Sequence, residues 1–244
     1  MLEGFNTIKL SGNSIKGNYD YAKWLNLKSR IIHYTPNILL SSIKSYNREE
    51  SFKIINESDP NFQITLDDFI IGGIFRLDDQ KCPHLFIETL AMLKECKIQF
   101  KSIVVGDGPL YSKCKALLNK YSLMEYVNFV GRKSDVSRYY SVFDIFMLTS
   151  RQEGTPNVLI EAQSLGLPCV TTDVGACSEV VIHNKTGLVV KPNNPNALMN
   201  ACLEMVTNPK KMKAFSQNAI EHSKRVFSPA NGLDHFNKLY SARN

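Results

Sequence analysis

Short apolar runs alternate with longer amphipathic runs along this chain from about residue 69. The alternation predicts a parallel β-sheet covered by helices, because buried parallel strands are apolar throughout and surface helices have one apolar face. Strands are predicted at residues 69–75, 100–106, 126–130, 145–148, 169–172 and 188–190. Helices are predicted at residues 83–94, 110–122, 135–141, 156–165, 195–207 and 209–225.

Prolines and glycines support these boundaries. Pro156, Pro195 and Pro209 each stand where a helix is predicted to begin, a position that suits proline. Gly166 and Pro168 separate one predicted helix from the next strand. Six strands with interleaved helices indicate an α/β domain with a doubly wound, Rossmann-like parallel sheet. Such folds bind ligands at the carboxyl ends of the strands, so the chemistry is expected in the loops that follow them.

The length of 244 residues corresponds to about one and a half domains, at roughly 150 residues per domain. The α/β pattern accounts for residues 67–227, and residues 228–244 predict one further amphipathic helix. Residues 1–66 are polar apart from scattered aromatic residues, and they contain one predicted strand at 30–34 and a linker-like stretch at 47–61. We therefore expect an incomplete N-terminal segment ahead of one complete domain.

The composition is that of a folded protein, with 43% apolar and 21% charged residues. No apolar run approaches the ~18 residues of a membrane span, and the N-terminus lacks the basic and then apolar pattern of a secretory signal. The six cysteines form no C-x-x-C pair, and no histidine stands at zinc-ligand spacing from them. We therefore expect a reducing, cytoplasmic location.

The net charge of +6 comes from 29 Lys and Arg residues against 23 Asp and Glu residues. Basic residues are not interleaved with aromatic residues as in nucleic-acid-binding proteins, so no nucleic-acid partner is expected. The densest basic run lies within residues 210–225 and has two interpretations. One is a solvated helix face, and the other is a peripheral contact with the anionic inner face of the membrane.

The loop at 72–81 follows the first predicted strand and carries two cations five positions apart, Arg76 and Lys81. A guanidinium fork, an ammonium charge and the free amides of a helix start together suit a diphosphate. The alternative is a pair of exposed cations on an ordinary loop.

The loop at 106–109 follows the second predicted strand and reads Gly-Asp-Gly-Pro. It resembles the start of the dinucleotide-binding G-x-G-x-x-G motif, but Tyr111 stands in place of the last glycine, which disfavours an NAD-type oxidoreductase. The glycines either let the backbone approach a ligand or form a plain tight turn.

The loop at 150–162 is the richest in candidate chemistry. Glu153 lies at the mouth of a predicted strand, and Pro156 and Asn157 begin a helix whose free N–H groups face that mouth. Glu161 lies about one turn inside this helix, where its carboxylate can accept the two hydroxyls of a ribose. The alternative, an ordinary exposed helix residue, conflicts with the apolar residues on either side of Glu161.

Motifs of several other chemistries are absent from the sequence. There is no G-x-x-x-x-G-K-[ST], no G-x-S-x-G, no H-E-x-x-H and no D-x-D triplet, and the histidines are isolated. We expect no metal site. The charge of a leaving diphosphate would then be met by Arg76, Lys81 and the start of the helix at 156.

Taken together, these residues resemble the donor-binding domain of retaining, GT-B fold glycosyltransferases of family 4. The resemblance covers roughly residues 69–244, and it rests on a set of motifs that includes the E-x7-E run beginning at Glu153. It is carried by residues 153–162, 166–175 and 179–181, and by the Arg76 to Lys81 spacing and residues 106–109, 129–132 and 185–192, all in the order of that family.

The resemblance implies a role for each matching position. Glu153 lies near the donor sugar and its developing oxocarbenium charge, and Glu161 binds the ribose. Arg76 and Lys81 are catalytic cations that stabilise the leaving nucleotide. The other donor-binding residues are predicted to be Gly154, Thr155, Pro156, Asn157 and Val158 around the sugar and phosphates, Gly131 and Arg132 at the base, and Gly106 and Asp107 in the second loop. The implied reaction is retaining sugar transfer from a nucleoside-diphosphate sugar to a glycan or lipid-linked acceptor, without metal or cofactor.

The chain departs from the family pattern in two ways. Phe75 and Cys82 replace glycines beside the arginine and the lysine, and they are expected to narrow the donor pocket. Family members also carry a first α/β domain for the acceptor, commonly with an active-site histidine, which cannot be assigned here. Residues 29–37 resemble the end of that domain and its hinge, so residues 1–66 are interpreted as its remnant.

Two functional hypotheses follow. The first is a glycosyltransferase of cell-surface polysaccharide synthesis. The second is a non-catalytic or partner-dependent nucleotide-sugar-binding module, for which a partner chain would supply the acceptor domain. A nucleotide-sugar isomerase is disfavoured by the intact pair of glutamates.

Overall fold

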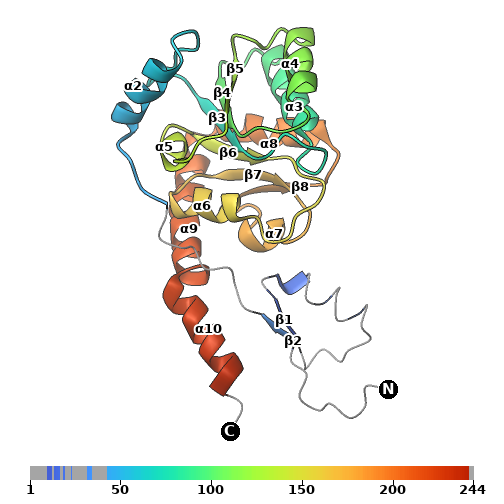
Figure 1. Ribbon diagram of the computed structural model, residues 1–244, viewed down its shortest axis with the longest axis vertical. Helices are drawn as coiled ribbons and strands as arrows, with labels where there is room; N and C mark the ends of the chain where they lie inside the picture. The colour runs from blue at the N-terminus through green and yellow to red at the C-terminus, as the bar shows by residue number, and fades with distance from the viewer. Residues whose placement is uncertain are drawn as a thin grey trace.

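A parallel sheet of six strands forms the centre of the computed structural model, which describes residues 10–12, 14–16, 19, 23, 32–34 and 43–241. The strand order is β5-β4-β3-β6-β7-β8 (Figure 1). The chain moves outwards from β3 to β5 and then returns to place β6 on the other side of β3. This reversal is the switch point of a doubly wound α/β fold, so the predicted Rossmann-like architecture is confirmed.

All six predicted strands are present, and each end agrees with the prediction to within one residue. They are β3 (Ile70–Ile74), β4 (Lys101–Val105), β5 (Val127–Gly131), β6 (Ile145–Leu148), β7 (Cys169–Thr172) and β8 (Gly187–Val190). The central strands are fully buried, as their apolar sequences require. The packing is tight between β3 and the segment before β6, because a Cβ on Gly72 would lie 2.0 Å from the ring of Phe143.

The helices form two groups on opposite faces of the sheet, as right-handed crossovers on the two sides of a switch point require (Figure 1). Helix α3 packs against α4 and α8, whereas α6 packs against α9. The bounds are α3 (Pro83–Glu95), α4 (Tyr111–Lys120), α5 (Ser137–Tyr140), α6 (Asn157–Ser164), α7 (Cys177–Val180), α8 (Pro195–Thr207) and α9 (Pro209–Val226). The short helix α7 is the one member of these groups that the sequence pattern did not predict.

The interpretation of residues 47–61 as a linker is wrong, because they contain helix α2 (Arg48–Ser58). The side chain of Asn47 caps this helix by accepting the N–H of Glu50 at 3.0 Å. Phe52 and Ile55 are buried, and they form a narrow apolar stripe within an otherwise polar sequence. The polar residues that suggested a linker are therefore the cap and the exposed face of a helix.

The described residues near the N-terminus include a second, two-stranded parallel sheet. Strand β2 (Ile32–Tyr34) lies within the predicted strand at 30–34 and pairs with β1 (Leu10–Gly12), which was not predicted. The rest of the predicted hinge segment at 29–37 lies outside the described residues. The Glu179 carboxylate of α7 accepts hydrogen bonds of 2.7–3.1 Å from the Ser14 hydroxyl and the next two backbone N–H groups.

The C-terminal helix α10 (Pro229–Ser241) lies within the predicted helix at 228–244, of which residues 242–244 are not described. It packs against the end of α9. Among the helices of the described residues, none combines the length and the apolar character needed to cross a bilayer.

Candidate active site

The three loops selected from the sequence meet at one edge of the sheet. The N–H of Arg151 donates to the carbonyl of Gln80 at 2.9 Å, and the Gln80 side chain donates to the carbonyl of Gln152 at 3.0 Å. The N–H of Leu77 donates to the carbonyl of Asp107 at 3.1 Å. These bonds join the loops after β3, β4 and β6 at the switch point, where doubly wound folds bind ligands.

Lys81 and Glu153 form an ion pair at the centre of this edge. The Lys81 ammonium lies 2.6 Å from Glu153 Oε1, and the side chains are 21% and 6% exposed. The Ser150 hydroxyl donates to the same oxygen at 2.5 Å. The predicted cation and the predicted sugar-facing carboxylate are therefore direct partners, and a buried hydroxyl holds the carboxylate from behind.

Gly175 supports Glu153 from the loop after β7. Its φ of +54° is left-handed, and a Cβ there would lie 2.0 Å from the Glu153 carbonyl oxygen. The N–H of Ala176 donates to the carbonyl of Gly154 at 2.9 Å. The backbone of the Glu153 loop is thus fixed by close contact with a position that only glycine fits.

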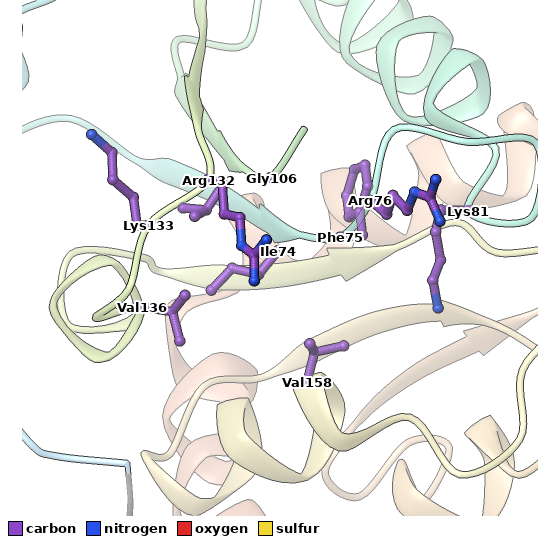
Figure 2. Close-up of a pocket in the computed structure, with 10 residues that line it drawn as sticks. Ile74, Phe75, Arg76, Lys81, Gly106, Arg132, Lys133, Val136 and Val158 are labelled. Carbon is purple, nitrogen blue, oxygen red and sulfur yellow. The ribbon is translucent and has the colours of Figure 1, made fainter. Parts of the chain in front are cut away.

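Arg76 is far more exposed than Lys81. Its side chain is 70% exposed, and its Nε lies 3.7 Å from the Asp78 carboxylate. Figure 2 shows Arg76 and Lys81 at one end of a pocket, with Arg132 and Val136 towards the other end and Val158 across from them. The alternative of two ordinary exposed cations therefore fails for Lys81, while Arg76 is open to solvent at the rim of the cleft.

Glu161 is partly buried inside α6, so it is not an ordinary exposed helix residue. The hydroxyl of Tyr140 donates to its Oε2 at 2.9 Å. Burial raises the pKa of the Glu161 carboxyl, and the hydrogen bond from Tyr140 opposes that rise. Burial and the nearby Glu161 charge raise the pKa of Tyr140.

Gly106 and Gly131 shape the floor of the cleft beside Arg76. The N–H of Gly106 donates to the carbonyl of Gly131 at 2.9 Å. Gly106 has a φ of +138°, and a Cβ there would lie 2.0 Å from the Phe75 carbonyl oxygen. The Asp107 carboxylate accepts the N–H of Gly108 at 2.7 Å, so this side chain also stabilises the turn.

Two adjoining cavities lie over this floor and share Arg76, Gly106 and Arg132. One has a volume of about 320 Å³ and is also lined by Phe75, Lys133, Val136 and Val158. The other has a volume of about 550 Å³ and reaches Asp107 and Gly108. The first is mainly apolar at its base with cations at its mouth, which suits a ring with attached phosphates.

The residues before α6 bring its first turn to the cleft. Pro156 is the N-cap residue and Asn157 the first helical residue, one position later than predicted. Gly154 and Thr155 connect this cap to Glu153, and Val158 lines the smaller cavity. The residues predicted to surround the sugar and phosphates, 154–158, therefore lie between the ion pair and the apolar cavity.

Phe75 and Cys82, the two residues that replace family glycines, are both buried beside the cleft. Phe75 is buried, packs edge-on against Phe86 with ring centroids 5.4 Å apart, and lines the smaller cavity. Cys82 is the N-cap residue of α3 with a φ of 49°, a left-handed conformation that glycine adopts more readily. Its thiol donates to the carbonyl of Asp79, and burial raises its pKa.

The sequence analysis assigned no site role to Ser150, Gly175 or Tyr140. Ser150 lies in the loop at 150–162 and Gly175 ends the run at 166–175, so both were within segments selected from the sequence, whereas Tyr140 belongs to no selected segment. In the part of the chain that the structure describes, no group of three or more His, Cys, Asp or Glu residues is placed to hold a metal ion.

Comparison with known proteins adds a family match. A family model described as "Glycosyl transferases group 1" matches residues 55–222. The Vi polysaccharide biosynthesis protein VipC/TviE of Salmonella typhi is 31% identical over 75% of this chain and 31% of its own length. The uncharacterized glycosyltransferase MJ1178 of Methanocaldococcus jannaschii is 30% identical over 87% of this chain and 60% of its own length. The chain thus spans less than two thirds of these relatives.

Solved structures share the fold. The chain matches Anabaena Alr3699/HepE in complex with UDP with a TM-score of 0.85 and 19% identity, over 96% of this chain and 64% of that one. It matches the C-terminal domain of a group 1 glycosyl transferase, LpcC from Francisella tularensis, with a TM-score of 0.65 and 19% identity, over 77% of this chain and 96% of that one. The described domain therefore has the architecture of the C-terminal half of a GT-B protein.

Proposed function

Because this chain belongs to the group 1 glycosyltransferases, we propose that it transfers a sugar from a nucleoside-diphosphate sugar, with retention, to a glycan or lipid-linked acceptor. The observation that carries the proposal is the meeting of two cations and one carboxylate, Arg76, Lys81 and Glu153, at the switch point of the sheet. A departing diphosphate gains negative charge while the sugar gains positive charge, so a donor site needs cationic and anionic side chains next to each other.

In this proposal Lys81 and Arg76 bind the diphosphate. The Lys81 ammonium exchanges its Glu153 partner for a phosphate oxygen, and Arg76 folds over the phosphates from its exposed position. The start of α6 adds backbone N–H groups and a positive helix dipole. The sum of these groups offsets the charge of the leaving nucleotide without a metal.

Glu153, once released from Lys81, faces the donor sugar and stabilises the positive charge that develops at the anomeric carbon. The bond that breaks joins this carbon to the diphosphate, and the new bond to the acceptor oxygen forms on the same face. The acceptor hydroxyl loses its proton to an oxygen of the departing diphosphate. The backbone from Gly154 to Val158 holds the sugar and phosphates next to Glu153. Retention is part of the proposal because the E-x7-E run that begins at Glu153 resembles that of the retaining enzymes of family 4.

The nucleoside end occupies the apolar cavity beyond the phosphates. Glu161 accepts the ribose hydroxyls, and Gly131 and Arg132 bind the base. Uridine is the proposed base, because Anabaena HepE was solved with UDP and with UDP-glucose, and one relative is named a UDP-Gal-dependent galactosyltransferase.

The acceptor is proposed from the relatives alone. The names of three refer to the biosynthesis of a polysaccharide, of lipopolysaccharide core or of colanic acid. We also propose a cytoplasmic location, with the exposed Lys210, Lys213, Lys224 and Arg225 of α9 facing the anionic membrane surface. Sedimentation with phosphatidylglycerol vesicles at low salt, and none with phosphatidylcholine vesicles, is the expected result. Equal sedimentation with both would contradict this contact.

The experiment that tests donor binding is calorimetry with UDP and uridine on the wild type and on Arg76→Ala. Loss of a charged hydrogen bond costs roughly 1.5–3 kcal/mol, so Arg76→Ala should weaken UDP binding at least tenfold and leave uridine binding almost unchanged. Arg225→Ala, a change of an exposed arginine on α9, is the matched control. Equal losses for UDP and uridine would refute the diphosphate role.

Turnover is tested separately with radiolabelled UDP-glucose. Release of labelled sugar, to water or to an added acceptor, would support a transferase. Tight donor binding without any release would identify the second hypothesis instead, a nucleotide-sugar-binding module that needs a partner chain.

A further inference from the structure

Tyr140 has a buried phenol whose hydroxyl lies beside the donor cleft. The residue is 1% exposed, yet its hydroxyl lies 2.9 Å from Glu161 Oε2 and 3.1 Å from the carbonyl oxygen of Val158. A tyrosine hydroxyl has one proton to donate, and both acceptors within hydrogen-bond distance of it belong to α6. The shorter contact is with Glu161, the proposed ribose-binding residue.

The ring of Tyr140 is held in place by the core. It packs against Phe143 with ring centroids 6.1 Å apart and against Phe146 with centroids 5.6 Å apart. Both neighbours are fully buried, and Phe146 lies in the central strand β6. A hydroxyl on a ring fixed in this way cannot follow a moving carboxylate, so the carboxylate must adapt to the hydroxyl.

The consequence falls on Glu161, which has a long side chain with several rotamers. A bond from Tyr140 to Oε2 selects one orientation of the carboxylate, and the remaining lone pairs are left for a ligand. A carboxylate that already has the orientation needed by two adjacent ribose hydroxyls binds them more tightly, because its side chain loses less conformational entropy on binding.

We propose that Tyr140 is a positioning residue that fixes the Glu161 carboxylate for a pair of ribose hydroxyls and so makes the site select ribonucleotides over deoxyribonucleotides. This inference rests on the proposed function, since it takes Glu161 as the ribose ligand. The other acceptor near the hydroxyl is the backbone carbonyl of Val158, a residue that lines the apolar cavity.

Calorimetry with UDP and 2′-deoxy-UDP tests the proposal on Tyr140→Phe, which removes the hydroxyl and keeps the ring. Tyr139→Phe is the matched control, because Tyr139 is a buried tyrosine of the same helix. Tyr140→Phe should weaken UDP binding about tenfold and 2′-deoxy-UDP binding much less, so that the preference for the ribonucleotide collapses. Tyr139→Phe should retain the preference. The ratio of the two affinities within one variant is independent of how much of that variant is folded.

A double-mutant cycle separates positioning from a merely structural role. In a Glu161→Ala background, Tyr140→Phe should change neither affinity further, because the carboxylate that it orients is gone. A preserved ribonucleotide preference in Tyr140→Phe, or equal losses in both backgrounds, would overturn the positioning role. Failure of the wild type to bind UDP, or an unchanged preference in Glu161→Ala, would instead overturn the proposed function on which this inference rests.

Discussion

At the scale of single residues, the ion pair between Lys81 and Glu153 sets a condition for binding an anion in the cleft. Lys81, which is proposed to bind phosphate, is already paired with the Glu153 carboxylate at 2.6 Å. A diphosphate must therefore displace Glu153 before it gains the full interaction with Lys81. In the proposed function, the diphosphate takes the place of Glu153 on Lys81, and the same event frees the Glu153 carboxylate to face the sugar.

Replacement of Glu153 by glutamine should tighten UDP binding while it abolishes most turnover. The neutral side chain keeps its shape but no longer competes for Lys81 or repels the phosphates, so roughly a threefold to tenfold gain in affinity is expected, or about 1 kcal/mol. Calorimetry with UDP and release of labelled sugar from UDP-glucose measure the two effects. Glu125→Gln, a change of an exposed glutamate far from the cleft, is the control. Weaker UDP binding in Glu153→Gln would contradict competition.

At the scale of elements, α2 shows how a polar sequence still forms a helix. Its N-cap residue Asn47 accepts the N–H of Glu50, and Arg48 binds both carboxylate oxygens of Asp144 at 2.9 and 3.1 Å. Asp144 also accepts the N–H of Ile70 at the start of β3. The helix is thus attached to the central strands through one carboxylate.

Asn47→Ala should lower the free energy of unfolding by about 1 kcal/mol, because it removes the cap of α2. Urea denaturation followed by circular dichroism measures the change. Asn61→Ala, in the exposed turn after the helix, should have almost no effect. A loss of the same size in both variants would show that the cap does not stabilise α2.

The elements also show what the sequence could predict. Both ends of β6 were predicted correctly, because its four consecutive apolar residues fit a buried strand and show no helical periodicity. α2 was missed because Phe52 and Ile55 are its main buried apolar residues. The loop residues of the cleft could be predicted because each loop follows a predicted strand. The hydrogen bonds of Ser150 and Tyr140 to the two glutamates could not be predicted, because a sequence does not show whether a hydroxyl points into a site or into the core.

At the scale of the whole molecule, His222 makes stability depend on pH. It is buried in α9, and its Nε2 has no hydrogen-bond partner among the described residues. Burial, and then the charge of Arg225, lower the pKa of His222 in the folded state. The unfolded chain then binds the proton more readily. Stability is therefore full above the unfolded pKa of about 6.5 and falls as the pH drops below it.

His222→Gln should flatten this dependence. The wild type should lose stability through this residue as the pH falls below about 6.5, and the variant should lose less. The midpoint of urea denaturation, measured across pH, reports the difference. His84→Gln, on the exposed face of α3, should keep the wild-type slope. Parallel curves for wild type and His222→Gln would exclude this residue as the source.

The reversal of strand order has a consequence for how such a site can change by recombination. The two proposed phosphate-binding cations come from one continuous stretch, 70–81, and the two glutamates from another, 143–161, and each stretch contains one of the two strands that flank the switch point. Relatives could therefore exchange the two stretches as blocks. The join is restricted at one place, because Gly72 leaves the room that the Phe143 ring occupies. A hybrid that inherits a larger residue at 72 must also inherit a smaller one at 143.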